Sequence, residues 1–282
     1  MDVLGLGAVA MDIIFNCEQL PKEDGYAVIG KEFATPGGSC ANVITTLAGL
    51  GTQTGFIAQL GADEYGRTLK ADFKARSVST RYVSIKEGGV SMHCYVAVAK
   101  NGSKTIFCNM GDSLLSLTEQ NVHPEMLHGI KAFYTGMQPC GPALKLARIC
   151  QEKDIPVICN LQVEPEFLSQ CNISGSQVEE MLSLCSLLIT FKNGLIRHTG
   201  KTNVHAASKF LYEKYQPEMG LIVTLGENGA FWLKKNSRLQ APAFNIKPVD
   251  TTGAGDAFIG GLIHAILSKK NDPEAAMRFA SA

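Results

Sequence analysis

Short apolar runs alternate with amphipathic stretches along the middle and C-terminal parts of this chain. The apolar runs have the length of buried strands and cover residues 3–6, 55–60, 132–134, 157–159, 187–190 and 221–225. The amphipathic stretches have helical spacing and cover residues 39–50, 65–76, 142–153, 176–184, 204–215 and 255–268. This alternation is typical of crossover helices on both faces of a parallel sheet. We therefore predict an α/β fold, with a doubly wound, mostly parallel central sheet flanked by helices, built by residues 1–282 as one domain.

The charge and hydropathy of the chain argue against two classes of partner. The 26 basic side chains are balanced by 26 acidic ones, so no basic field attracts nucleic acid. No apolar run approaches the roughly 20 residues that span a bilayer. Residues 3–12 are apolar but lack a basic segment, so they indicate a first strand and not a signal peptide. We expect no nucleic-acid partner and no membrane partner.

Cysteine usage indicates the compartment. The nine cysteines form no C-x-x-C pair and no zinc-binding spacing. Several lie within apolar strands or helices, where a free thiol behaves as a small hydrophobic group. We expect reduced, buried thiols in a cytoplasmic protein.

The most informative motif is the sequence DTTGAGD at residues 250–256. Its small residues let backbone N–H groups converge, and the apolar spacing that follows predicts a helix directly afterwards. A glycine-rich turn at a helix N-terminus suits phosphate, because its N–H groups are unpaired and the helix dipole is positive there. Asp256 would accept a proton from a hydroxyl that attacks a phosphoryl group. Alone, the motif is equally compatible with an ordinary turn before a buried helix.

A second glycine turn, in the sequence PGGSCANV at residues 36–43, again leads into a helix. The two motifs, in this order and position, resemble those of the ribokinase-like (PfkB) carbohydrate and nucleoside kinases. The resemblance extends from residue 3 to about residue 280. It implies an ATP-dependent kinase that phosphorylates a hydroxymethyl group of a sugar or nucleoside.

The same resemblance gives a role to two segments that interrupt the alternation. Residues 13–33 contain two β-like runs, and residues 90–108 have the pattern of a hairpin that turns at Asn101-Gly102. In the resembled family, insertions at about 13–35 and 89–110 form a small β-sheet lid over the sugar site. The resemblance also implies a homodimer through this lid.

Four residues match the acceptor side of the family's site: Asp12, Gly37, Gly38 and Asn42. Carboxylate and amide groups suit hydroxyl contacts, and the two glycines would let a sugar approach the backbone. On their own, Asp12 could be a turn residue or helix cap, and Asn42 a helix cap. Ser39 already suits the capping role near Asn42.

The nucleotide side of the family's site matches Thr224, Gly226, Gly229, Thr252 and, with a shift, Asn193. Backbone N–H groups at Gly253, Ala254 and Gly255 would stabilise the transferred phosphoryl group. Asp250 matches a loop that holds a monovalent cation in the family. The resemblance therefore implies ATP, Mg²⁺ and possibly K⁺. Alone, residues 221–230 are a plain strand–turn–strand signal.

Three features depart from the family pattern. The Asn-x-x-Glu element near residue 190 lacks its glutamate, which puts metal handling in question. Asn160 stands where many members have an aspartate. The sequence reaches Ala282 inside an expected helix, whereas members continue with a tail that helps to enclose adenine and the cation. We expect that the sequence is trimmed here or that the tail is dispensable.

Two other functions remain open. The absent glutamate favours a catalytically weak or inactive sugar- or nucleoside-binding protein on the same fold, although a pure binder needs no base such as Asp256. A dinucleotide-dependent oxidoreductase is suggested by Gly5-Leu6-Gly7, but Ala10 replaces the third glycine of that fingerprint and no acidic residue follows at the expected strand end. The sequence does not distinguish among ribose, fructose-type sugars and adenosine as the acceptor.

Overall fold

A large sheet forms the centre of the molecule. The computed structural model describes residues 1–282 apart from 236, 247–250 and 269–271. Within the described residues, nine strands lie in the order β13 (Ser237–Ala241), β12 (Ala230–Lys234), β11 (Gly220–Thr224), β10 (Leu187–Phe191), β9 (Val157–Leu161), β8 (Ala132–Thr135), β1 (Val3–Leu6), β4 (Thr54–Gly61) and β5 (Ser79–Lys86). All pairs from β11 to β5 are parallel, and β12 is antiparallel to both neighbours.

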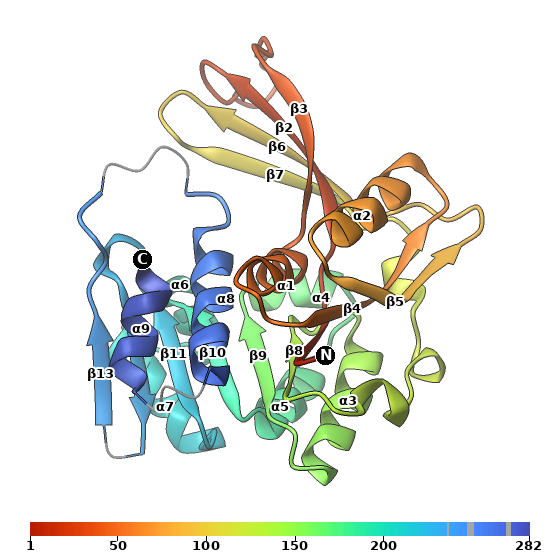
Figure 1. Ribbon diagram of the computed structural model, residues 1–282. Coiled ribbons are helices and arrows are strands. Elements are labelled where there is room, and N and C mark those ends of the chain that lie inside the picture. Colours follow the sequence, from red (N-terminus) through yellow and green to blue (C-terminus); the bar gives the residue numbers. More distant parts are fainter. Residues whose placement is uncertain (236, 247–250, 269–271) are drawn as a thin grey trace.

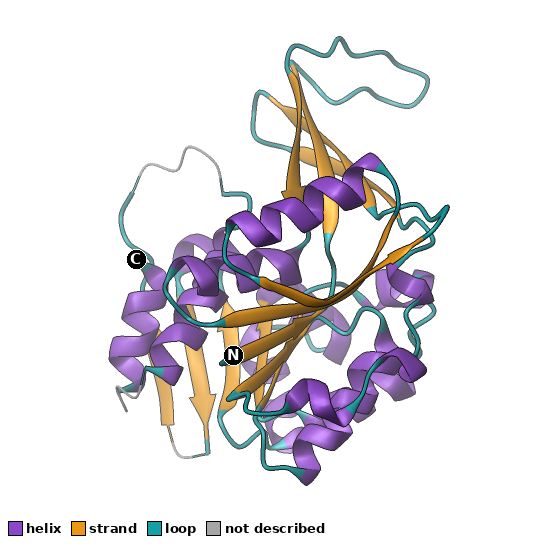
Figure 2. Ribbon diagram, turned by 45° about the vertical axis from the view of Figure 1, so that its right-hand side comes forward, coloured by secondary structure: helices purple, strands orange, loops and turns teal. Residues whose placement is uncertain are grey.

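Helices cover both faces of this sheet (Figure 2). They are α1 (Ser39–Gly49), α2 (Glu64–Ala75), α3 (Cys140–Glu152), α4 (Pro165–Gln170), α5 (Gly175–Leu184), α6 (Lys192–Thr199), α7 (Val204–Tyr215), α8 (Ala254–Leu267) and α9 (Pro273–Ser281). Short 3-10 helices occur at Leu114–Ser116, Glu119–Asn121, Pro124–Leu127 and Gly226–Asn228. Two buried apolar clusters result: one contains residues of α1, α8 and α9, and the other residues of α3, α5 and α7. Among the described helices, none combines the length and apolarity needed to cross a bilayer.

The predicted doubly wound architecture is confirmed. Each strand and helix predicted from the apolar pattern is present, with ends within two residues of the expected ones. The central parallel strands are buried along almost their whole length, as expected where helices cover both faces. The order of the strands brings the carboxyl ends of β9, β10 and β11 side by side.

A separate four-stranded sheet stands above the central sheet (Figure 1). Its order is β3 (Glu32–Gly37), β2 (Ala10–Cys17), β6 (His93–Ala99) and β7 (Lys104–Asn109). Strands β2 and β3 come from the first insertion, whereas β6 and β7 form the predicted hairpin. The expected small sheet is therefore present, and we call it the lid.

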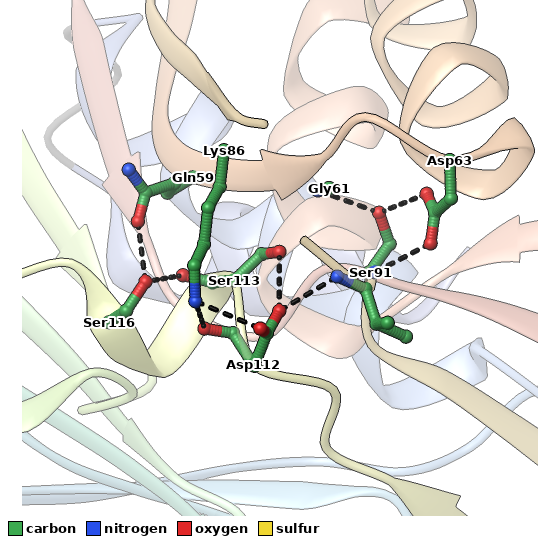
Figure 3. Close-up of polar contacts among 9 residues, drawn as sticks. Gln59, Gly61, Asp63, Lys86, Ser91, Asp112, Ser113 and Ser116 are labelled. Atoms are coloured by element: carbon green, nitrogen blue, oxygen red, sulfur yellow. Dashed lines mark hydrogen bonds and ion pairs between the residues drawn. The ribbon is translucent and has the colours of Figure 1, made fainter. Parts of the chain in front are cut away.

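Two carboxylates fasten the base of the lid, where the chain enters β6 and leaves β7 (Figure 3). Asp63 caps α2 by accepting from the N–H of Gly66 at 2.7 Å, and it also accepts from the N–H and Oγ of Ser91, both at 2.7 Å. Asp112 accepts from the N–H of Val90 at 2.7 Å and from Lys86 Nζ at 2.9 Å. Asp63 therefore caps a helix of the main body and, together with Asp112, holds the base of the lid against it.

Candidate active site

Asp256 lies in the first turn of α8 and is held by two side chains of α1. Its Oδ1 accepts from Ser39 Oγ at 2.5 Å, and its Oδ2 accepts from Asn42 Nδ2 at 2.9 Å. Helices α1 and α8 can pack closely here because Gly260 faces Thr46, where a Cβ would lie 2.7 Å from the threonine side chain. The two glycine motifs, more than 200 residues apart in sequence, therefore meet at one carboxylate.

The glycine pair before α1 lies against the start of the lid. A Cβ on Gly37 would lie 2.0 Å from Asp12 Oδ2, so only glycine leaves room for that carboxylate. Gly38 has a φ of 89°, and a Cβ there would lie 2.6 Å from the Cα of Val9. The glycines therefore fix Asp12 of β2 beside the N-terminus of α1.

A cleft of about 290 Å³ joins the lid to the main body. Its walls include the acceptor residues predicted from the sequence, namely Asp12, Gly37 and Asn42, together with Thr252 and Gly253 of the glycine-rich loop. Arg76, the C-cap residue of α2, also lines this cleft, and its Nε donates to both carboxylate oxygens of Asp72 at 2.9 Å. The cleft therefore joins the acceptor residues to the glycine-rich loop, whereas Asp256 and the predicted nucleotide residues Thr224, Gly226, Gly229 and Asn193 are not part of its lining.

Burial perturbs both carboxyl groups of the site. It raises the pKa of Asp256, although hydrogen bonds from Ser39 and Asn42 partly oppose the shift. Burial also raises the pKa of Asp12, and the nearby charge of Asp256 raises it further. Carboxyl groups with raised pKa values in a cleft are typical of catalytic sites. An aspartate in this state is a better proton acceptor than one in water.

The predicted phosphate-binding loop lies at the N-terminus of α8. Gly253 is its N-cap, with a φ of 76°, and among the described residues outside the local backbone no atom lies within 4 Å of the Cβ positions of Gly253 and Gly255. Helix geometry leaves the first N–H groups without helical partners. The N–H of Ala254, however, donates to the carbonyl of Thr251 at 3.2 Å. A phosphate would therefore find open space beside the glycines, whereas the N–H of Ala254 already has a partner.

The predicted nucleotide residues lie at the carboxyl ends of two adjacent parallel strands. Thr224 ends β11 opposite Phe191 of β10, and Asn193 is exposed in the first turn of α6. Gly226 and Gly229 have φ values of 63° and 81° in the turn between β11 and β12. A Cβ on Gly229 would lie 2.1 Å from a carbonyl oxygen, whereas the space beside Gly226 is open. These residues share an edge of the sheet, where ligands commonly bind in open α/β folds.

A protein-built metal site is not evident in the described part of the chain. No group of three or more metal-ligating side chains occurs there. Ile196, which stands where the glutamate of the Asn-x-x-Glu element is expected, packs against the core. Asp250, the residue matched to a monovalent cation, lies outside the described residues. The side chains present therefore fit a Mg²⁺ ion held mainly by nucleotide phosphates and water.

Sequence reasoning misassigned Ser39 and missed its partner. Gly38, and not Ser39, is the N-cap of α1, and it makes no side-chain capping bond. The Ser39 hydroxyl instead lies between Asp256 and Gln162, to both of which it is within hydrogen-bond distance. Asn160, the residue found in place of an aspartate, is buried and donates to Gln162 Oε1 at 2.9 Å. The one sequence signal for Gln162 is its position directly after the apolar strand β9.

The oxidoreductase interpretation of Gly5-Leu6-Gly7 is wrong. The dinucleotide fingerprint needs a helix after the first strand, but β1 leads into lid strand β2. A Cβ on Gly5 would lie 2.5 Å from Ile44, and one on Gly7 would lie 2.4 Å from Cys40 Cβ. These glycines therefore allow α1 to pack against β1.

The parallel sheet, the separate small sheet and the half-buried aspartate at the start of α8 are the features of a ribokinase-like fold. The chain belongs to the pfkB family of carbohydrate kinases, whose model matches residues 2–282. It is 27% identical to ribokinase of Bacillus subtilis over 98% of this chain and 89% of that protein. It is 26% identical to fructokinase of Solanum tuberosum over 88% of this chain and 78% of that protein.

Solved structures share the fold at lower identity. Ribokinase of Arabidopsis thaliana, complexed with ribose and ATP, has a TM-score of 0.81 and 21% identity over 99% of this chain and 90% of that one. Adenosine kinase of Sinorhizobium meliloti has a TM-score of 0.83 and 18% identity over 99% and 91% of the two chains. The chain therefore belongs to a family of phosphotransferases that act on a hydroxyl group, and the members of this family differ in substrate.

Proposed function

We propose that this protein transfers the γ-phosphoryl group of ATP to a hydroxymethyl group of an unphosphorylated sugar or nucleoside. The observation that carries the proposal is the Asp256 carboxylate, held by Ser39 and Asn42 at the N-terminus of α8. A base and an anion cradle at one helix terminus match the needs of an attacking hydroxyl and a transferred phosphoryl group. A protein that only binds its ligand has no need of a base beside a phosphate site.

Asp256 would accept the proton of the attacking hydroxyl. Each of its oxygens has a second lone pair, so both could accept an acceptor hydroxyl while keeping their bonds to α1. The hydroxyl of Ser39 carries one hydrogen for two acceptors, Asp256 and Gln162. It would donate to Asp256 while the base is ionised. It would turn to Gln162 once the base is protonated, and so stabilise both states.

Asp12, Gly37, Gly38 and Asn42 would bind the acceptor. Asp12 lines the cleft together with Gly37 and Asn42, and the absence of side chains at Gly37 and Gly38 leaves room for its carboxylate there. Arg76 is the arginine of that wall, and Asp72 already neutralises its charge. This pairing favours an acceptor without a phosphate group. A nucleoside kinase of the same fold was solved with inosine, and the ribokinase with ribose, so both acceptor classes suit the fold.

The nucleotide would lie along the sheet edge formed by Thr224, Gly226, Gly229 and Asn193, with its phosphates at Thr252, Gly253, Ala254 and Gly255. The open space beside Gly253 and Gly255 fits a phosphoryl group. Bound Mg²⁺ would neutralise phosphate charge, and an E. coli protein of this fold was solved with ATP and Mg²⁺. Asp250 would belong to a K⁺ site. The backbone groups of α8 would stabilise charge on the transferred phosphoryl group.

We further propose that residues 1–282 form one domain with its lid at about 13–35 and 89–110, in a cytoplasmic homodimer. Large apolar side chains are exposed on the lid, which supports a contact between two lids. They include Phe33, Tyr95, Ile106 and Phe107.

A coupled assay for ADP release tests the proposed function. Ribose, fructose and adenosine would be screened with ATP over a range of Mg²⁺ concentrations, with calorimetry of each acceptor in parallel. We expect turnover with at least one acceptor, and activity that still rises when free Mg²⁺ exceeds ATP, because few protein carboxylates hold the metal. Micromolar binding of an acceptor without turnover at any Mg²⁺ concentration would favour the inactive binding protein instead.

A further inference from the structure

Two cysteines continue a row of side chains that includes Asp12. Strand pairing places Thr35 opposite Asp12, Asp12 opposite Cys94, and Cys94 opposite Cys108. Directly paired residues in a sheet point to the same face. The row therefore crosses the whole lid on the face that carries Asp12, and it ends with Cys94 on β6 and Cys108 on the edge strand β7.

The two thiols are placed for a covalent bond. Cys94 and Cys108 are directly opposite each other on antiparallel strands, and their sulfur atoms are 3.3 Å apart. Opposed residues on such strands have Cα atoms about 4.5–5.5 Å apart. That separation falls within the range of about 4.4–6.8 Å found for disulfides. Of the nine free cysteines only Cys108 is exposed, so the pair is also the one that a reagent in solution reaches.

The contact between the thiols gives them different reactivities. The S–H of Cys94 donates to the sulfur of Cys108, and this hydrogen bond lowers the pKa of Cys108 to about 7. The same hydrogen bond, together with burial, raises the pKa of Cys94. The negative charge of Asp12 opposes ionisation of both thiols but does not cancel the effect of the hydrogen bond. The exposed cysteine is therefore the better nucleophile.

We propose that Cys94 and Cys108 form a reversible disulfide by exchange with a low-molecular-weight disulfide such as glutathione disulfide, and that this bond weakens acceptor binding under the lid. The formation of the bond rests on the geometry of the thiols alone. Its effect on the acceptor rests on the function proposed above for Asp12.

The exchange is balanced in two steps. The thiolate of Cys108 attacks one sulfur of glutathione disulfide, forms a mixed disulfide and releases one glutathione thiolate. The thiol of Cys94 then loses its proton to solvent and attacks the sulfur of Cys108, which releases the second glutathione. Two protein thiols are oxidised to one disulfide, and one glutathione disulfide is reduced to two glutathione molecules.

The bond would change the lid next to Asp12. The sulfur atoms would approach from 3.3 Å to about 2.05 Å, which fixes the separation of β6 and β7 in the row that contains Asp12. Strand β7 is exposed along its whole length and has β6 as its neighbour in the sheet, so it can move in the reduced protein. A cross-linked edge strand would no longer adjust to the acceptor, whereas the nucleotide residues lie on other elements.

The test equilibrates the full chain in glutathione buffers of increasing oxidised fraction. Peptide mass mapping follows the disulfide, amide hydrogen exchange follows residues 93–109, and kinetics give KM for ATP and for whichever of ribose, fructose and adenosine is turned over. We expect a Cys94–Cys108 bond, slower exchange in β6 and β7, and a rise in acceptor KM of about threefold or more with the ATP KM unchanged. Dithiothreitol should reverse all three changes.

Three variants separate the possible explanations. Cys94→Ser should stop at a mixed disulfide that retains one glutathione, and Cys108→Ser should not react. Cys17→Ser, which removes a buried thiol elsewhere in the lid, should behave as the wild type. No bond between Cys94 and Cys108 in oxidised buffer would overturn the proposal, even if the protein has no kinase activity. A bond that leaves hydrogen exchange and acceptor KM unchanged would overturn it as well.

Discussion

At the scale of single residues, the partial burial of Asp12 and Asp256 serves the proposed chemistry but lowers the stability of the folded protein at neutral pH. Both pKa values are raised in the folded protein, chiefly by burial. A raised pKa means that the ionised form is less favourable in the folded state than in the unfolded state. The contribution of such a group to stability is therefore fully present below the unfolded pKa and is lost as pH rises through the folded pKa.

Asp12→Asn should make the free protein more stable at neutral pH. The substitution removes the unfavourable buried charge and its repulsion by Asp256. Thermal unfolding from pH 3 to pH 8 would show a gain in Tm at the upper end that vanishes below about pH 4, where both states protonate the aspartate. The same variant should bind the acceptor more weakly. A loss of stability at pH 7 would contradict the stated cause of the raised pKa.

Ser39→Ala should shift the acidic limb of the pH–rate profile. The bond from Ser39 lowers the pKa of Asp256, so its removal should move the limb of kcat/KM to higher pH. Among the described residues, the other titratable groups whose electrostatics involve Asp256 are Asp12, Cys40 and Tyr134, and the substitution leaves all three in place. Turnover should fall by less than the roughly 10²–10⁴-fold cost of losing a base.

A matched hydroxyl deletion serves as the control for Ser39. Ser183 of α5 is exposed, and among the described contacts its hydroxyl donates to the carbonyl of Glu180 at 2.7 Å, so Ser183→Ala should keep the wild-type profile. An unshifted limb in Ser39→Ala would show that the hydroxyl does not act through Asp256.

Sequence reasoning found the carboxylates but not the residues that orient them. Asp12 and Asp256 stand in recognisable local motifs, whereas the contact between Ser39 and Asp256 joins residues 217 positions apart. Ser39 was predicted to be a helix cap because Ser is common at that position. The tertiary contact overrode that preference, and Gln162 lies in no motif that would have indicated it.

At the scale of elements, apolar periodicity identified those that are buried on one or both faces. Strand β5 was missed because it lies at the sheet edge and has Val83 as its one buried residue. Helix α4 was missed for a similar reason, since Leu168 is its one buried side chain. Helix α6 starts directly after β10 without a turn, so no local signal separates the two elements.

The lid base couples a helix cap to the acceptor site. Asp63→Ala removes the cap of α2 and the bonds to Ser91, so we expect a loss of stability of about 0.5–2 kcal/mol and a higher acceptor KM. Asp272→Ala is the matched control, because it removes the cap of α9 without touching the lid. Urea unfolding and acceptor kinetics on both variants give the measurement. Equal acceptor KM values in the two variants would rule out coupling through the lid base.

At the scale of the whole molecule, the lid is the surface proposed to join two subunits. Phe107 is 63% exposed on β7, and Tyr95 lies opposite it on β6. Phe107→Asp should convert a dimer to a monomer, because it places a charge in an apolar contact. Phe210→Asp alters an exposed aromatic residue of α7, away from the lid, and should leave the dimer intact. Analytical ultracentrifugation of the three proteins decides the matter, and a monomeric wild type would exclude the lid dimer.

The central chemical claim for the whole molecule is that Asp256 accepts the proton of the attacking hydroxyl. Asp256→Asn retains the size of the side chain and a partner for Asn42, but it cannot accept this proton. Asp154→Asn, at an exposed turn position with a φ of 53°, is the matched control, since asparagine tolerates that conformation.

The measurement is single-turnover transfer of labelled phosphate from ATP to the acceptor found in the screen, with calorimetry of acceptor binding. The account predicts that Asp256→Asn slows transfer by roughly 10²–10⁴-fold while acceptor affinity largely survives, and that Asp154→Asn matches the wild type. Near-normal transfer by Asp256→Asn would contradict the account.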